Sequence, residues 1–168
     1  MSSSFTKRVT KEIQLYQKDN FSFPNLILQP SESLDIWYFI IHDLKDTDYE
    51  DGIYLGKVTL PPRYPFKPPY FRLITKSGRF EINKDICTSF SAFHAELYSP
   101  SWNIASMCAG LTSLMTDLDS NVESKGIGGI LMSKEERQKI AQESKNVILK
   151  NDIYQKYFSQ YTELLKLD

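Results

Sequence analysis

Four short runs rich in β-branched and aromatic residues constrain the fold of this chain more than any other feature. They cover 25–29, 34–44, 53–60 and 70–74, and Pro, Ser, Asp and Gly residues punctuate the gaps between them. Gaps this short favour antiparallel neighbours, because a parallel pair needs a crossover of roughly a dozen residues or more. The sequence therefore predicts a four-stranded antiparallel meander.

A helix is predicted before these runs, over 4–19. Its apolar residues recur at helical spacing: Phe5, Val9, Ile13 and Tyr16. Its outer face carries the basic residues Lys7, Arg8 and Lys11. These cations would attract an acidic partner surface, although a charged outer face is also typical of any soluble helix.

Further helices are predicted after the runs. A largely irregular stretch at 75–100 is followed by an apolar helical face at 102–115. Ser133 and Glu136 have the spacing of a capping box before another helix, and a last amphipathic helix is predicted over 153–164. Helix, meander and then helices indicate an α+β fold.

Length and composition exclude several classes. A chain of 168 residues fits one domain, and a formal charge of −1 gives no reason to expect nucleic acid as a partner. The apolar run WYFII at 37–41 is far shorter than the roughly 20 residues of a membrane span. The two cysteines, Cys87 and Cys108, lack the spacing of a zinc site. The N-terminus has no apolar signal core, so reduced thiols in a cytoplasmic protein are expected.

The surroundings of Cys87 suit a carrier of thioesters better than a hydrolase. A thiol forms thioesters readily, and the ester stays activated toward amines. A cysteine hydrolase needs a His base beside the thiol, whereas the segment NKDICTSF around Cys87 contains no His. On the residues alone, an inert buried cysteine remains an alternative. Cys108 lies between Met107 and Leu111 on an apolar helical face, so we expect it in the core.

The order of three motifs resembles a known family. The run YEDGIYLGKVTLPPRYPFKPPYFRLIT at 49–75 is followed by Cys87 and then by SPSW at 99–102. This order is similar to the core of the ubiquitin-conjugating enzymes, in which a YPFKPP turn leads to a nucleophilic cysteine and a WSPAL-type motif opens the next helix. The segment TKSGRFEINKDICTSFSAFHAELYSPSW is most similar to the endoplasmic-reticulum branch, which has a TPNGRF motif. The resemblance covers nearly the whole chain and implies the UBC fold over 1–168: an N-terminal helix, a four-stranded meander, a catalytic loop, then central and C-terminal helices.

The same resemblance implies a function. Cys87 would accept ubiquitin from the activating enzyme as a thioester and pass it, with a ligase, to substrate proteins. No cofactor is expected, since the separate activating enzyme consumes the ATP. The branch implies degradation of reticulum proteins, with the protein in the cytoplasm or, if an anchor follows Asp168, at the cytosolic face of the reticulum. Two alternatives stay open: a non-catalytic UBC variant that binds ubiquitin or other partners, and a conjugating enzyme for another ubiquitin-like modifier.

One family residue is missing from its expected place. The family stabilises the oxyanion of the reaction with an Asn amide, and here Ser77 stands at that position with Gly-Arg-Phe after it. Three donors are possible: the Ser77 hydroxyl, the Asn83 amide turned inward, or backbone N–H groups aided by a ligase. Both side chains are also ordinary turn residues.

His94 and two turns complete the candidate site. His94 lies seven residues after Cys87, where it would take a proton from an incoming amine or hydroxyl, or else serve as a structural histidine. Glu96 is a weak candidate for an acidic helper. In the family the turns that contain Phe66 and Pro100 lie beside the N-terminal helix and receive the ligase, although Phe66 could instead cover the core.

Overall fold

The four predicted runs form one antiparallel sheet in the computed structural model, which describes residues 1–88, 91–117 and 126–167. The strands are β1 (Leu26–Pro30), β2 (Ile36–Ile41), β3 (Tyr54–Thr59) and β4 (Tyr70–Leu73), and they lie in the order of the chain. The meander is therefore confirmed. The second strand is shorter than predicted because Leu34 and Asp43 adopt positive φ angles of 64° and 55°, which a continuing strand does not allow.

Each of the helices begins at a side-chain cap. The helices are α1 (Ser3–Lys18), α2 (Ile104–Thr116), α3 (Lys134–Leu149) and α4 (Asp152–Tyr157). Their caps are Ser2, Asn103, Ser133 and Asn151. The predicted capping box of Ser133 and Glu136 is present, with both of its hydrogen bonds. Over the described ranges, no helix has the length and apolar character needed to cross a membrane.

The prediction of one helix over 153–164 is wrong. The α-helix stops at Tyr157, because Phe158 has φ −128° and ψ 0°. A short 3-10 turn, η4 (Ser159–Tyr161), follows it. The Phe158 side chain is fully buried. Burial of this ring against the sheet, and not the helical periodicity of the sequence, therefore determines the backbone conformation at Phe158.

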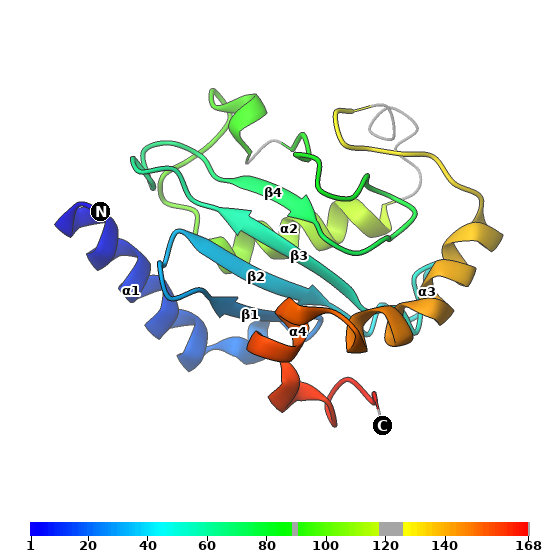
Figure 1. Cartoon of the computed structure of the whole chain (residues 1–168). Helices are drawn as coiled ribbons and strands as arrows, with labels where there is room; N and C mark the ends of the chain where they lie inside the picture. Colours follow the sequence, from blue (N-terminus) through cyan, green and yellow to red (C-terminus); the bar gives the residue numbers. More distant parts are fainter. Residues whose placement is uncertain (89–90, 118–125, 168) are drawn as a thin grey trace.

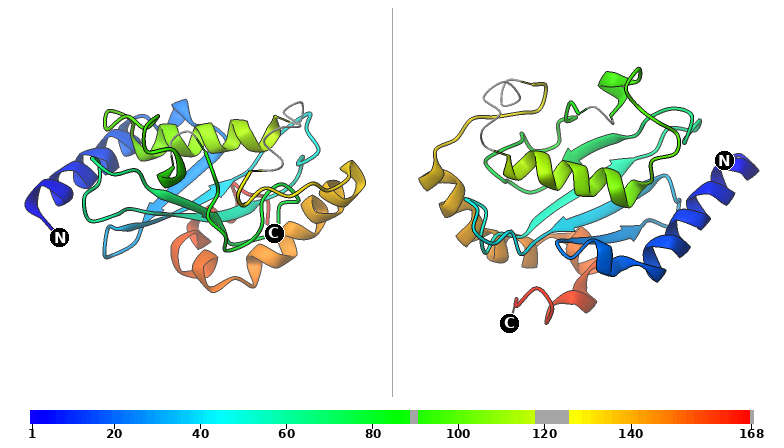
Figure 2. Two further views of the ribbon diagram at one scale, coloured as in Figure 1. Left: turned by 90° about the horizontal axis from the view of Figure 1, so that it is seen from above. Right: turned by 180° about the vertical axis from the view of Figure 1, so that it is seen from behind.

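The sheet is covered on both faces, but by different helices (Figures 1 and 2). Helix α2 lies on one face and shares a large apolar core with α1 and the strands, in which Cys108 is fully buried as predicted. On the other face, α4 and the C-terminal residues bury a second apolar cluster that includes Ile27, Ile40 and Phe158. The segments 76–88 and 126–130 lie beyond the β4 side of the sheet, joined by a bridge between Phe80 and Gly129.

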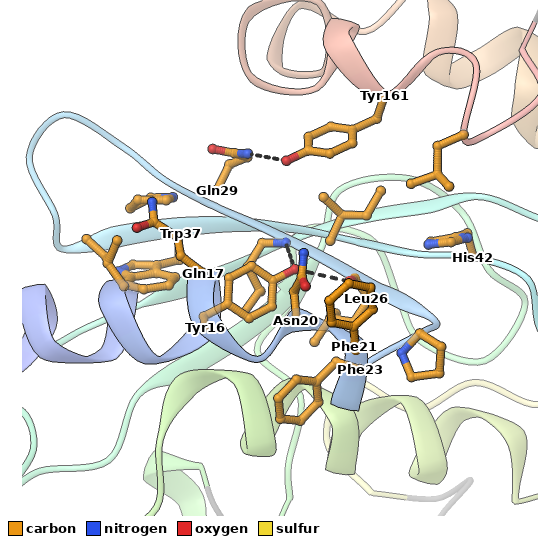
Figure 3. A pocket seen from close by; sticks show the side chains of 16 residues that line it. Tyr16, Gln17, Asn20, Phe21, Phe23, Leu26, Gln29, Trp37, His42 and Tyr161 are labelled. Carbon is orange, nitrogen blue, oxygen red and sulfur yellow. Dashed lines mark hydrogen bonds between the residues drawn. The ribbon is translucent and has the colours of Figure 1, made fainter.

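A tyrosine on α1, Tyr16, forms hydrogen bonds to the free edge of the sheet at β1. A groove of about 440 Å³ lies between α1, β1 and the C-terminal residues Tyr161 and Leu164 (Figure 3). Within it, the Tyr16 hydroxyl donates to the Leu26 carbonyl at 3.2 Å and accepts from the Leu28 N–H at 3.1 Å. An unpaired strand edge invites pairing with another chain. Tyr16 occupies two of the main-chain groups through which such pairing would occur.

We expect Tyr16→Phe to lower the free energy of unfolding by about 1–3 kcal/mol, because two main-chain groups lose their partner. Urea unfolding followed by tryptophan fluorescence measures this loss. Tyr70→Phe is the matched control, since Tyr70 is an exposed sheet tyrosine (41% accessible) whose substitution should change stability by less than about 0.5 kcal/mol. Equal losses in the two variants would show that Tyr16 acts only through its ring.

Candidate active site

The segment that carries Cys87 is fixed by main-chain hydrogen bonds on both sides. The N–H of Ile86 donates to the carbonyl of Phe71 in β4, and the N–H of Cys87 donates to the carbonyl of Ile127, each at 2.9 Å. Gly128 has a φ of +82°, and a Cβ at this position would lie 2.6 Å from the Asp85 carbonyl oxygen. A glycine is therefore required where the 126–130 segment meets the cysteine segment.

Cys87 has a histidine beside it. The Cys87 Sγ lies 3.0 Å from the His94 Nε2, and the His94 Nδ1 lies 3.3 Å from a carboxylate oxygen of Glu96. A histidine therefore stands next to the thiol although NKDICTSF contains none, so the sequence-based argument for a carrier over a hydrolase is not supported. In the described part of this loop, the Ser91 hydroxyl donates to the Thr88 carbonyl at 3.0 Å, and η2 (Ala92–His94) follows immediately.

The arrangement can move a proton. If Nδ1 carries the hydrogen that it donates to Glu96, Nε2 has a lone pair for the thiol proton of Cys87. Hydrogen bonds from the Glu96 backbone and from the His94 ring lower the pKa of the Glu96 carboxyl. It is therefore an anion at neutral pH, although 70% of its side chain is exposed. Within the described ranges, no group of three or more His, Cys, Asp or Glu residues is placed to hold a metal ion.

The candidate oxyanion donors lie in turns. Ser77 has no exposed surface, and its Oγ accepts hydrogen bonds from the N–H groups of Arg79 and Phe80 at 3.1 and 3.2 Å. Asn83 is exposed, with a left-handed φ of 57° that asparagine tolerates well. Fewer backbone N–H groups are available as oxyanion donors as well, because the N–H groups of Cys87 and Thr88 already donate to the Ile127 carbonyl and the Ser91 hydroxyl. The role of each group in catalysis stays a prediction.

Ser77→Ala separates a turn role from a catalytic one. We expect the free energy of unfolding to fall by about 1–3 kcal/mol, because two buried N–H groups lose their acceptor. At a temperature where the variant is folded, and if Cys87 carries a ubiquitin thioester as the resemblance implies, we expect the rate of its discharge onto free lysine to change by less than about threefold, since the Ser77 hydroxyl is inaccessible. Loss of an oxyanion donor would instead slow discharge by roughly 100-fold or more, which would contradict the turn assignment.

The predicted partner residues fall into two groups. Phe66 is 72% exposed, and Pro100, Lys7 and Lys11 are exposed as well, so all four are available to a partner. Arg8 is different. Its guanidinium donates to the carbonyls of Pro100 and Trp102 at 2.8 and 2.6 Å, which holds α1 against the turn before α2. The structure thus places Arg8 as a residue that fixes this surface from within the chain.

Sequence reasoning missed Glu12, which joins three segments of the predicted partner surface. Its carboxylate is 5% exposed. It accepts from the Tyr64 hydroxyl at 2.6 Å, from the N–H of Ile104 at 2.7 Å and from the Arg8 Nε at 2.5 Å. Burial, followed by the negative charge of Glu12, raises the pKa of the Tyr64 hydroxyl far above its usual range. The available signal was the position of Glu12, three residues after Val9 on the apolar stripe of the helix.

Comparison with known proteins identifies the family. The family model described as "Ubiquitin-conjugating enzyme" matches residues 8–156. This chain belongs to the ubiquitin-conjugating enzyme family. It is 36% identical over 159 residues to Ubiquitin-conjugating enzyme E2 6 of Schizosaccharomyces pombe, covering 95% of this chain and 66% of that protein. The UBC fold expected from the motifs is the one observed.

Other members of the family show similar matches. The chain is 34% identical to Probable ubiquitin-conjugating enzyme E2 33 of Arabidopsis thaliana, over 94% of this chain and 62% of that protein. It is 37% identical to human Ubiquitin-conjugating enzyme E2 J1 over 70% of this chain and 36% of that protein. The chain thus spans about two thirds or less of the length of these curated relatives.

Proposed function

We propose that this chain carries ubiquitin as a thioester on Cys87 and, together with a ligase, transfers it to substrate proteins. The observation that carries the proposal is the partly exposed Cys87 thiol, which main-chain hydrogen bonds fix in the UBC fold. Membership of the ubiquitin-conjugating enzyme family supplies the modifier, the activating enzyme and the ligase as partners.

Charging proceeds by exchange between two thiols. The Cys87 Sγ attacks the carbonyl carbon of the ubiquitin thioester on the activating enzyme, while His94 Nε2 accepts the thiol proton. The new S–C bond forms, and the old one breaks to release the thiol of the activating enzyme, which takes up a proton. ATP is used in the earlier step on that enzyme, so no cofactor is required in this chain.

Transfer to the substrate again uses Cys87 and His94, with the Cys87 sulfur now as the leaving group. An amine or hydroxyl of the substrate attacks the thioester carbonyl, and His94 Nε2 takes the proton that the nucleophile loses. The Cys87 sulfur then leaves and recovers a proton from the imidazolium. The ligase would bind the surface formed by Phe66 and Pro100 and hold the substrate near the thioester.

We also propose a place for this activity in the cell. The GRF-containing segment before Cys87 resembles the endoplasmic-reticulum branch of the family, which supports a role in the degradation of reticulum proteins from the cytosolic side.

A charging assay tests the proposal. The protein is incubated with activating enzyme, Mg-ATP and ubiquitin and analysed on gels with and without thiol reductant. We expect an adduct of one ubiquitin that disappears on reduction. An adduct formed only with another modifier and its own activating enzyme would show that this enzyme carries that modifier and not ubiquitin. No adduct with any modifier, from a folded protein, would favour a UBC variant that only binds its partners.

A further inference from the structure

The imidazole beside Cys87 loses a hydrogen-bond donor when the free enzyme becomes charged with ubiquitin. In the free enzyme, the thiol hydrogen of Cys87 can occupy the lone pair of His94 Nε2 across 3.0 Å. A thioester sulfur has no hydrogen to donate. Charging therefore leaves the Nε2 lone pair without that donor, next to the carbonyl carbon to which the sulfur is bonded.

This site is also open to water. The His94 side chain is 41% exposed, and Cys87 is only partly buried. On the far side of the ring, Glu96 Oε1 lies 3.3 Å from Nδ1, where it favours the tautomer with a free Nε2. An electrophilic carbonyl carbon, an imidazole nitrogen with a lone pair and solvent access are thus combined at one position, which is the arrangement that general-base hydrolysis requires.

We propose that the charged enzyme hydrolyses its own ubiquitin thioester, with His94 as the general base. The inference rests on the proposed function, because it needs ubiquitin on Cys87. The activity limits the lifetime of the charged state when no acceptor is bound. Water and the acceptor then compete for the same base, and a bound acceptor wins because it is held in place at high effective concentration.

The step balances without a further reactant. A water oxygen attacks the thioester carbonyl carbon, and Nε2 removes one proton from that water. The tetrahedral intermediate collapses with cleavage of the C–S bond. Cys87 leaves as a thiolate and is reprotonated by the imidazolium. The products are the original thiol enzyme and ubiquitin with a free C-terminal carboxyl group, which releases its proton to the solvent.

The test follows the decay of the thioester. The protein is charged, ATP is removed with apyrase and EDTA, and the adduct is followed in an amine-free buffer. We expect His94→Asn to slow the decay by about 100-fold, the lower end of the typical range for general-base catalysis. His42→Asn is the matched control, since His42 is the only other histidine of the chain and should leave the decay unchanged.

One further readout separates hydrolysis from self-modification of the enzyme. Mass spectrometry should find free ubiquitin as the product. Equal decay of wild type and His94→Asn, or transfer of the ubiquitin to lysines of the enzyme, would overturn the inference. Absence of any wild-type adduct would instead overturn the proposed function beneath it.

Discussion

Cys87→Ala should form no reductant-sensitive ubiquitin adduct, whereas Cys108→Ala should charge to a level within about twofold of the wild type. The difference arises from the surroundings of the two thiols. Cys87 is partly exposed and has His94 Nε2 at 3.0 Å. Cys108 is fully enclosed by the core, and burial, followed by the negative charge of Glu12, raises the pKa of its thiol far above the usual range. A thiol that is inaccessible and stays protonated does not attack a carbonyl.

Two controls make this result decisive. Iodoacetamide at pH 7.5 should modify Cys87 in the folded wild-type protein and leave Cys108 unmodified until urea is added, which intact-mass spectrometry detects directly. Circular dichroism checks that both variants fold. A comparable adduct on both single variants would disprove the assignment of Cys87 as the site of the thioester.

Glu12→Ala should lower the free energy of unfolding by about 2–4 kcal/mol, since it removes a buried carboxylate that accepts from two neutral donors and from the partly buried Arg8. The substitution leaves the Tyr64 hydroxyl and the Ile104 N–H without their acceptor, and it leaves Arg8 without its carboxylate. Urea unfolding at neutral pH measures the loss.

Lys11→Ala is the matched control for Glu12→Ala, because Lys11 is exposed on the same helix and should cost less than about 0.5 kcal/mol. Glu12→Gln keeps the shape of the side chain but not its charge, so its loss should lie between those of the two alanine variants. A loss below about 1 kcal/mol for Glu12→Ala would show that the neighbouring groups find other partners and that Glu12 is not a structural centre.

The sheet and most helices were predictable because their signals are local. Short gaps force antiparallel neighbours, and capping residues such as Ser133 mark the start of a helix. Local signals failed where a distant contact decides the backbone. The periodicity over 153–164 is helical, yet the ring of Phe158 is buried on the sheet and the helix ends there. No pattern within residues 153–164 indicates that the Phe158 ring packs against the sheet.

The candidate site was predictable only in part, for the same reason. The position of Cys87 between two motifs was sufficient to propose it over Cys108 as the nucleophile, and that role stays a prediction. His94 was a candidate from the sequence, but its contact with Cys87 was not predicted, because a separation of seven residues does not determine whether two side chains meet. Glu12 was missed because a carboxylate on an apolar stripe has meaning only when its three donors, from α1, the Tyr64 turn and the start of α2, are known.

The hydrogen bonds of Arg8 and Glu12 have a consequence for how a ligase would recognise this protein. The exposed Phe66 and Pro100 belong to turns that are held to α1 from opposite parts of the sequence; Glu12 and the Ile104 N–H, for example, are 92 positions apart. The proposed ligase-binding surface is therefore conformational. Linear peptides that copy either turn should bind a ligase far more weakly than the folded chain does, and a partly unfolded enzyme would pass unrecognised.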